Sequence, residues 1–329
     1  MSALRQSPRP SLWRSANPPM RDWQDLRVWV VGASSGIGRA CAHALWQAGA
    51  QVIVSARQTA ALQGFVDEHP AGPVPMEDLQ NRSSHFGRLA ALGFLPRAWA
   101  MGYKNRLAAT HPAGQHGTAQ QVLQALPRRW QPQAETLDVT DSAACQAVAQ
   151  RILANGPLDM VLYCAGHYRA MRATAMDVPD IHRHNAINYL GAVHVTNAVL
   201  PAMRTRGQGH LSFISSVAGF RGLPNGLAYG PTKAALTHWA QTLYLDLAPH
   251  GLGVSVVHPG FVQTPLTAQN QFQMPGIITP EKAARAMLRD WAAGRFESHY
   301  PKRFSRVMKC LRWLPDRLYF VLVRRITGL

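Results

Sequence analysis

A phenol and an ammonium group lie four residues apart in this chain, at Tyr229 and Lys233, and Ser216 lies thirteen residues before the phenol. A spacing of four places two side chains on one face of a helix, about one turn apart, so the lysine charge can stabilise the tyrosinate. An unperturbed tyrosine titrates near pH 10, whereas a general acid or base works best when its pKa is near the operating pH, at about 7. The pattern is therefore that of an acid/base pair, although many helices carry Tyr and Lys at this spacing as a plain surface pair.

A glycine-rich turn near the other end of the chain supplies a second kind of chemistry. It follows the apolar segment 29–31 and precedes the helix-like segment 39–45. Glycines there permit a tight turn and a close backbone approach, and the N-terminus of the new helix offers free N–H groups to a pyrophosphate. The turn predicts a dinucleotide site that includes Gly32, Ser34, Ser35, Gly36, Ile37 and Gly38.

The glycine spacing G-x-x-x-G-x-G, followed by this Ser, Tyr and Lys, resembles the classical short-chain dehydrogenase/reductase family. The resemblance runs from about Asp25 to Tyr300, and it implies that Asn188 is a fourth catalytic residue. It also implies cofactor contacts at the positions that match the family's motifs, which are Asp138, Val139, Ala165, Gly166, Pro259, Gly260, Val262 and Thr264, in addition to Tyr229 and Lys233.

Some of these positions have simpler interpretations or depart from the family pattern. Asp138 is of a type that commonly serves as a turn residue or helix N-cap. Thr264 precedes a proline, and its role could be simply to shape the turn at that proline. Val31 stands where the family usually has Thr, and Tyr163-Cys164 replaces an Asn pair, which removes local polar contacts but no chemistry.

The resemblance implies a mechanism for the four residues together. During reduction, hydride leaves the nicotinamide for a carbonyl carbon while Tyr229 delivers a proton to the oxygen, and Ser216 holds that oxygen by a hydrogen bond. Lys233 is expected to lower the pKa of Tyr229 and to bind the nicotinamide ribose, and Asn188 to position a water molecule.

The end of the second strand favours NADP(H) over NAD as the cofactor. An NAD site usually carries an acidic residue about 20 positions after the glycines, and that carboxylate would repel a 2′-phosphate. This chain has Ala56 there and Arg57 next, whose guanidinium can bind a phosphate through two hydrogen bonds. Arg39 could add a contact. The alternative is that Arg57 is only a solvated loop cation.

The fold class predicted is α/β, a single Rossmann-like domain with a doubly wound parallel sheet. A chain of 329 residues suffices for one large domain, expected over 25–300 after a flexible segment 1–24. Long helices are predicted over 186–203 and 228–247, and strands over 27–31, 51–55, 134–137, 160–164, 210–214, 254–258 and 296–300.

The four cysteines form no C-x-x-C pair and no metal cluster with histidine, which indicates buried thiols in a reducing compartment. Without an apolar leader or spanning segment, the protein is expected in the cytoplasm.

Two segments exceed what such a domain needs. The connection between Arg57 and Glu135 is long enough to contain an insertion, placed at about 65–117, which could be an ordered lid or partner surface, or a mobile surface excursion. The C-terminal extension 301–329 has apolar residues at helical spacing from Phe304 to Leu314, then a short apolar run among arginines. It predicts either peripheral contact with an anionic membrane or a tail that covers the cleft or a neighbouring subunit.

The net charge of +17 suits anionic partners in general, but the basic residues are scattered and match no nucleic-acid module, so no nucleic acid is expected. The predicted function is NADP(H)-dependent oxidation and reduction of a carbonyl or secondary alcohol, with a hydrophobic, lipid-like substrate. A reductase of small soluble carbonyls and a non-catalytic nucleotide sensor are the alternatives. By resemblance, a homodimer or homotetramer is expected.

Overall fold

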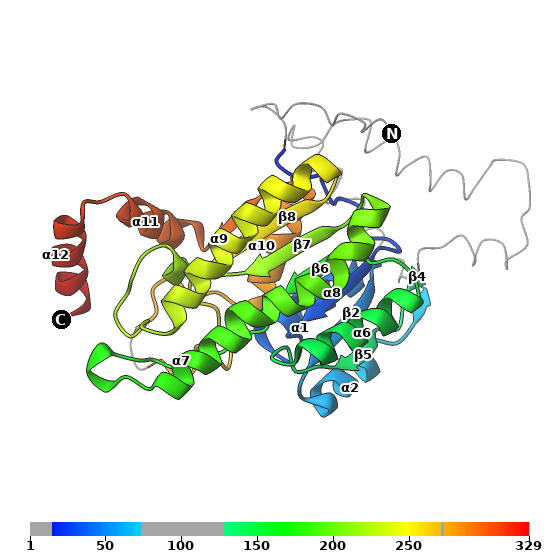
Figure 1. Ribbon diagram of the computed structural model, residues 1–329, viewed down its shortest axis with the longest axis horizontal. Helices are drawn as coiled ribbons and strands as arrows, with labels where there is room; N and C mark the ends of the chain where they lie inside the picture. Colours follow the sequence, from blue (N-terminus) through cyan, green and yellow to red (C-terminus); the bar gives the residue numbers. More distant parts are fainter. Residues whose placement is uncertain (1–14, 74–127, 271–272, 329) are drawn as a thin grey trace, which may run out of the picture.

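Seven parallel strands form a single sheet in the computed structural model, which describes residues 15–73, 128–270 and 273–328 (Figure 1). The strand order is β5-β2-β1-β6-β7-β8-β9, so the chain runs outward in one direction from β1 and then returns to build the other half from β6. The strands are β1 (Arg27–Val31), β2 (Gln51–Ala56), β5 (Gln133–Thr136), β6 (Met160–Tyr163), β7 (His210–Ile214), β8 (Gly253–Pro259) and β9 (Glu297–Tyr300). The reversal between β1 and β6 is the place where ligands bind in open parallel sheets.

Helices cover both faces of the sheet because its strands are apolar on both sides. One core lies under α6 (Ser142–Ala154), α8 (Gly191–Arg206) and α9 (Tyr229–Leu247), and Figure 1 shows α8 and α9 crossing the near face. The other core lies under α1 (Gly36–Gln47), α2 (Thr59–Glu68) and α10 (Pro280–Ala292). Val30 and Trp29 are neighbours in β1 and fall in different cores, as the alternation of side chains along a strand requires. The doubly wound fold class predicted from the sequence is confirmed.

The helix predicted to begin at Ala186 begins earlier. The segment α7 (Val178–Asn185) runs through a π-helical turn, η2 (Ala186–Leu190), directly into α8. Asp177 caps α7 by accepting a hydrogen bond from the Asp180 N–H, and a proline occupies the first turn. Short 3₁₀ turns, η1 (Ala173–Ala175), η3 (Val217–Gly219) and η4 (Ala248–His250), complete this half of the domain.

The segment before β1 was predicted to be flexible over 1–24, and its described part, from residue 15, is instead packed onto the domain. The buried Asn17 side chain accepts a hydrogen bond from the Val254 N–H and donates to its carbonyl, at 2.9 and 2.8 Å. Trp23 packs edge-on against Trp291, with ring centroids 5.8 Å apart. These contacts join the segment to β8 and α10. Residues 1–14 lie outside the described part of the chain.

The insertion was predicted to start at Phe65, which is too early. Phe65 is buried in α2, and its helix continues to Glu68 because Leu62, Phe65 and Val66 pack on the sheet. A short antiparallel pair, β3 (Gly72–Pro73) and β4 (Arg128–Arg129), then brings the two ends of the excursion together. The rest of the predicted insertion, residues 74–117, lies outside the described residues.

Two helices follow the last strand. The first, α11 (Lys302–Arg312), packs Met308 against Val217 and Phe220, with Phe304 and Leu311 at the edge of the same cluster. Val307, part of the predicted apolar stripe, faces solvent instead. The second, α12 (Asp316–Thr327), lies at the edge of the molecule beyond α11 (Figure 1). No helix within the described ranges is both long and apolar enough to cross a bilayer.

Candidate active site

A cleft of about 420 Å³ opens at the carboxyl ends of the strands, beside the reversal of strand order. Residues from the glycine-rich turn, the ends of β2, β6, β7 and β8, and α9 line it. Of the residues predicted to act in catalysis or to bind cofactor, those in its wall are Gly32, Ser34, Ser35, Gly36, Ile37, Arg57, Asp138, Val139, Ala165, Gly166, Ser216, Tyr229, Lys233, Pro259, Gly260, Val262 and Thr264. Three predicted residues, Gly38, Arg39 and Asn188, are not in the wall.

The glycine-rich turn is so close to its neighbours that side chains would not fit. Gly32 has φ +91°, and a Cβ there would lie 2.4 Å from the Ala165 nitrogen. A Cβ on Gly38 would lie 2.1 Å from the Gly32 carbonyl oxygen, so Gly38 supports the turn from beneath. Ser35 caps α1 without a side-chain hydrogen bond to the helix, which leaves the first N–H groups of α1 for a ligand. The turn therefore fits a pyrophosphate.

Tyr229 is the first residue of α9, and Lys233 follows one turn later, with its Nζ 5.5 Å from the Tyr229 ring centroid. Ser216 comes directly after β7 and receives a hydrogen bond from the Ala218 N–H at 3.1 Å. Burial raises the pKa of Tyr229 above its usual value near 10, and a hydrogen bond with Ser216 opposes that rise. That Lys233 lowers this pKa stays a prediction.

Lys233 is a buried cation, with 3% of its surface exposed. Its Nζ donates a hydrogen bond to the Ile214 carbonyl at 2.8 Å, and no carboxylate pairs with it among the described residues. Burial lowers the pKa of Lys233 to about 8. A buried ammonium group with donors to spare suits neutral oxygen acceptors such as ribose hydroxyls, so this position fits a nicotinamide nucleotide.

Asn188 lies in the π-helical turn, and its amide is fully engaged by protein groups. Its Oδ1 accepts a hydrogen bond from the His167 N–H at 2.7 Å, and its Nδ2 donates to the His167 carbonyl and to Thr232 Oγ1, each at 3.0 Å. The side chain thereby ties the loop after β6 to α9. That Asn188 positions a water molecule stays a prediction.

The two arginines predicted at the adenosine end differ in their surroundings. Arg57 is exposed in the cleft wall at the end of β2. Arg39 turns away from the cleft, where its guanidinium pairs with Glu68 at 2.6 Å and covers the Phe65 ring at 5.3 Å. Arg39 thus joins α1 to α2 from outside the cleft wall, and its contact with cofactor stays a prediction.

Two other predicted cofactor residues keep both of their interpretations. Asp138 lines the cleft, but its Oδ1 also accepts hydrogen bonds from the N–H and hydroxyl of Thr140, at 2.9 and 2.8 Å, as a turn residue does. Thr264 shares hydrogen bonds with Thr267, and its Cγ2 lies 2.8 Å from where a Gly36 Cβ would stand. Thr264 therefore meets the glycine-rich turn across the cleft.

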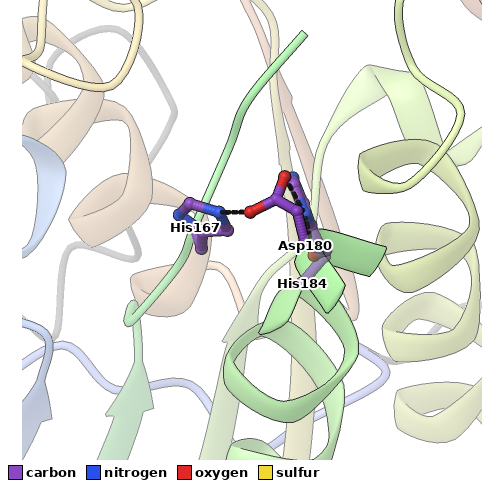
Figure 2. A group of neighbouring side chains, drawn as sticks. All are labelled: His167, Asp180 and His184. Carbon is purple, nitrogen blue, oxygen red and sulfur yellow. Dashed lines mark hydrogen bonds and ion pairs between the residues drawn. The ribbon is translucent and has the colours of Figure 1, made fainter. Parts of the chain in front are cut away.

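Sequence analysis missed a group of titratable residues beside the cleft (Figure 2). The His167 Nε2 lies 2.8 Å from the Asp180 Oδ1, and the buried His184 bonds the Asp180 carbonyl through Nδ1 at 2.8 Å. The Arg169 N–H donates to the Nε2 of His184 at 3.2 Å, so Nε2 is the acceptor and Nδ1 carries the proton. The possible metal-ligand atoms of these residues lie within 4.8 Å of one another, although no metal site was predicted. Both ring nitrogens of His184 already take part in hydrogen bonds, so the group stabilises the loop 167–169 through hydrogen bonds. In the sequence, the sign of this group is the spacing of four between Asp180 and His184, which places both on one face of a helix.

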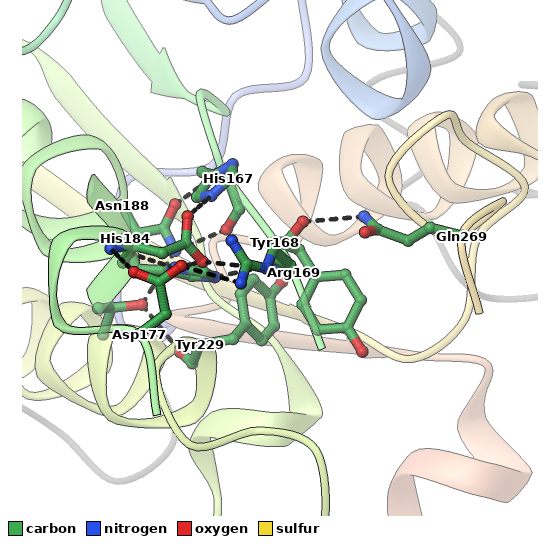
Figure 3. A network of polar contacts seen from close by, with 10 residues as sticks. His167, Tyr168, Arg169, Asp177, His184, Asn188, Tyr229 and Gln269 are labelled. Atoms are coloured by element: carbon green, nitrogen blue, oxygen red, sulfur yellow. Dashed lines mark hydrogen bonds and ion pairs between the residues drawn. The ribbon is translucent and has the colours of Figure 1, made fainter. Parts of the chain in front are cut away.

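The same loop places Tyr168 next to Tyr229 (Figure 3). The rings of Tyr168 and Tyr229 meet edge to face, with centroids 5.0 Å apart. The Tyr168 hydroxyl donates to Asn270 at 3.1 Å, and its carbonyl accepts from Gln269 at 2.8 Å. Tyr168 therefore joins the loop after β6 to the segment 264–270 on the opposite wall.

Comparisons with known proteins agree with this geometry. The profile of the short chain dehydrogenase family matches residues 27–77 and 96–274. An uncharacterised oxidoreductase of Myxococcus xanthus is 29% identical over 301 residues, covering 90% of this chain and 96% of that protein. A 3-dehydrosphinganine reductase of Danio rerio is 32% identical over 155 residues, 44% of this chain and 47% of that protein. A short-chain dehydrogenase from Streptomyces avermitilis shares the fold, with a TM-score of 0.62 and 22% identity over 93% of this chain and 98% of its own.

Proposed function

This chain belongs to the short-chain dehydrogenase/reductase family of oxidoreductases, and we propose that it transfers hydride between NADP(H) and the carbonyl or secondary alcohol of a hydrophobic, lipid-like compound. The observation that carries the proposal is the meeting of Ser216, Tyr229 and Lys233 in one cleft with the glycine-rich turn. A nicotinamide nucleotide bound in this cleft supplies or accepts the hydride.

The side chains of this site supply proton transfer and charge stabilisation. Tyr229 donates the proton to the carbonyl oxygen during reduction and takes it back during oxidation. Ser216, which shares a hydrogen bond with Tyr229, holds the same oxygen and stabilises the charge that develops on it. Lys233 presents an ammonium group from one helical turn away, which favours the tyrosinate once proton transfer has occurred.

The preference for NADP(H) rests on the end of β2. Arg57 lines the cleft there without an ion pair among the described residues, and its charge acts on the neighbouring carboxylate of Asp138. Ala56 stands where a carboxylate would select the ribose hydroxyl of NAD. An exposed guanidinium at this position can bind a 2′-phosphate through two charge-assisted hydrogen bonds.

The lipid-like substrate class has support from the cleft and from one relative. Tyr168, Pro265 and Leu266 give the wall near Tyr229 an apolar part. The Danio rerio relative carries the name of a reductase with a sphingoid substrate, and the match spans about half of its length. The polar His167, Thr267 and Gln269 in the same wall favour the second candidate, a reductase of small soluble carbonyls.

The experiment is to measure NADPH and NADH oxidation by the purified protein with long-chain and with short polar ketones. We expect NADPH-dependent turnover of long-chain ketones that falls by at least about 100-fold in Tyr229→Phe, since positioned acid/base groups contribute roughly that much. In Arg57→Gln, kcat/KM for NADPH should fall by about tenfold or more while that for NADH stays unchanged.

Arg204→Gln, at the exposed end of α8, serves as the charge-matched control for Arg57→Gln. Equal losses with both cofactors in Arg57→Gln would contradict the NADP(H) preference. Turnover confined to short polar ketones would establish the second candidate instead, and cofactor binding without turnover of any ketone would indicate a nucleotide sensor.

A further inference from the structure

The last helix exposes an apolar surface that the domain leaves uncovered. Leu318, Leu322 and Ile326 recur every four residues along α12 and form one stripe, with exposed fractions of 59%, 37% and 68%. Val321 lies beside the stripe. We define the docking face as this stripe with Val321 and with Trp313 in the turn before the helix, which together are Trp313, Leu318, Val321, Leu322 and Ile326.

The one buried residue of α12 fixes how the helix is held. Tyr319 is 1% exposed, and its hydroxyl donates to the Gly222 carbonyl. Arg221 covers the Tyr319 ring at 3.9 Å, pairs with Asp316, and donates to the carbonyls of Leu311 and Leu314 at 3.2 and 2.6 Å. A single guanidinium thus joins the end of α11, the start of α12 and the loop after β7. Tyr319 anchors the first turn of the helix, and the residues of the docking face stay exposed.

The charge around the docking face has one sign. Arg312, Arg317, Arg324 and Arg325 are all exposed, and none has an ion pair among the described residues. The only acidic residue of 313–328 is Asp316, which Arg221 already pairs. A second copy of the chain seated on this face would bring like charges together, whereas an anionic surface would complement them.

We propose that the docking face binds peripherally to an anionic lipid bilayer. Apolar side chains interleaved with arginines on a short helix, with Trp313 at 83% exposure in the turn before it, suit a helix that lies in the headgroup region. With 12 residues, α12 is too short to span a bilayer and lies along the surface instead.

The anchor connects the docking face to the walls of the cleft. Arg221 lies five residues after Ser216, and Val217 and Phe220 between them pack against Met308 of α11. Phe304, at the start of α11, contacts the Gly260 region, where a Cβ would lie 2.8 Å from its ring. Docking would therefore bring the substrate end of the cleft close to the lipid. This consequence rests on the proposed lipid-like substrate, but the docking itself does not.

The test is co-sedimentation of the full chain with vesicles of phosphatidylcholine alone and of phosphatidylcholine with 30% phosphatidylserine, a composition of about physiological charge. We expect binding to the anionic vesicles only, weakened at least about tenfold in Arg317→Gln/Arg324→Gln/Arg325→Gln, because each arginine near such a surface contributes severalfold. Leu318→Ser/Ile326→Ser should weaken binding similarly. Leu245→Ser, which alters an apolar residue of α9 that is 73% exposed, and Arg204→Gln should bind as the parent does.

Each variant is also assayed for NADPH oxidation with a soluble ketone and for its melting temperature. Loss of vesicle binding with unchanged turnover and melting supports the docking face and is independent of the identity of the substrate. Equal binding to neutral vesicles, equal loss in the control variants, or no binding at all would overturn the proposal. So would a dimer in solution that Leu318→Ser/Ile326→Ser dissociates, since the face would then bind a second copy.

Discussion

At the scale of single residues, the feature with the greatest electrostatic consequence is the buried ammonium group of Lys233. It lies within a turn of Tyr229 and bonds a backbone carbonyl in place of a carboxylate. Burial penalises its charged form, so its pKa is lowered to about 8 and the group loses its proton within an accessible pH range. If Lys233 must be charged to assist Tyr229, the activity of the enzyme should therefore fall at alkaline pH.

We predict that kcat/KM for NADPH falls as pH rises through about 8, because the free protein then loses the Lys233 charge. In Lys233→Arg, which keeps its charge to above pH 12, the alkaline limb should disappear even if activity is lower throughout. The measurement is a pH profile of initial rates from pH 6 to about 10. An identical alkaline limb in the parent and in Lys233→Arg would assign it to another group.

His167, Asp180 and His184 show how polar contacts outside the catalytic set fix the cleft wall. Burial acts to raise the pKa of Asp180, but the hydrogen bond from His167 and the nearby His184 and Arg169 outweigh it and lower that pKa. The carboxylate is thereby kept charged as an acceptor for His167. The loop that carries Tyr168 is held by this group at one side and by Asn188 at the other.

At the scale of elements, the connection from β1 to α1 depends on backbone contact. Gly38 lies in the first turn of α1, and its Cα faces the Gly32 carbonyl with no room for a methyl group. The helix can pack on the turn, and so present its N–H groups to the cleft, only without a side chain there.

Gly38→Ala should destabilise the fold by about 1–3 kcal/mol, since a Cβ would overlap backbone atoms that cannot rotate away. It should also weaken cofactor binding, because α1 or the turn must shift. Gly64→Ala in α2 is the matched control: a Cβ there meets nothing within 4 Å, and removing a helical glycine should stabilise by about 0.5–1 kcal/mol. Denaturant unfolding and NADPH titration measure both variants, and equal effects of the two would show that the contact is unimportant.

At the scale of the whole molecule, α11 makes the chain after the last strand part of the domain. Glu297 at the start of β9 pairs with Lys309 of α11 at 2.6 Å and lies 3.2 Å from the buried His258 Nδ1 of β8. Burial acts to raise the pKa of Glu297, but the neighbouring His258 and the hydrogen bond from Lys309 outweigh it and lower the pKa to about 2. This carboxylate joins the edge of the sheet to α11.

Because the pKa of Glu297 is lower in the folded chain, its contribution to stability is present above its unfolded pKa, near 4.5, and is lost as pH falls toward about 2. We expect Glu297→Gln to cost on the order of 2 kcal/mol at pH 7, and the difference from the parent to shrink between about pH 4.5 and 3. Chemical denaturation at several pH values measures this. A difference that stays constant with pH would show that the charge contributes nothing.

The sequence by itself determined the strands, the long helices and most of the residues that line the cleft. The sequence placed all seven strands to within a residue or two. The inner strands are short apolar runs, and the edge strands β5 and β9 follow from the alternation of strands with helices. The motifs around Gly32, Ser216 and Tyr229 placed most of the cleft, since each needs particular residue types at fixed spacing. Whether those residues act as predicted awaits the tests above.

Only the tertiary structure decided which side chains were free to meet a ligand. Arg39 and Arg57 are the same residue type, one directly after the glycines and one after the second strand, yet Arg39 pairs with Glu68 and Arg57 faces the cleft. The Asn188 side chain is hydrogen-bonded to His167. Of the two C-terminal helices, α11 packs against the domain, whereas most apolar residues of α12 are exposed. A local pattern specifies a helix or a turn, but the partner of a side chain depends on residues distant in the chain, and those are known only once the chain has folded.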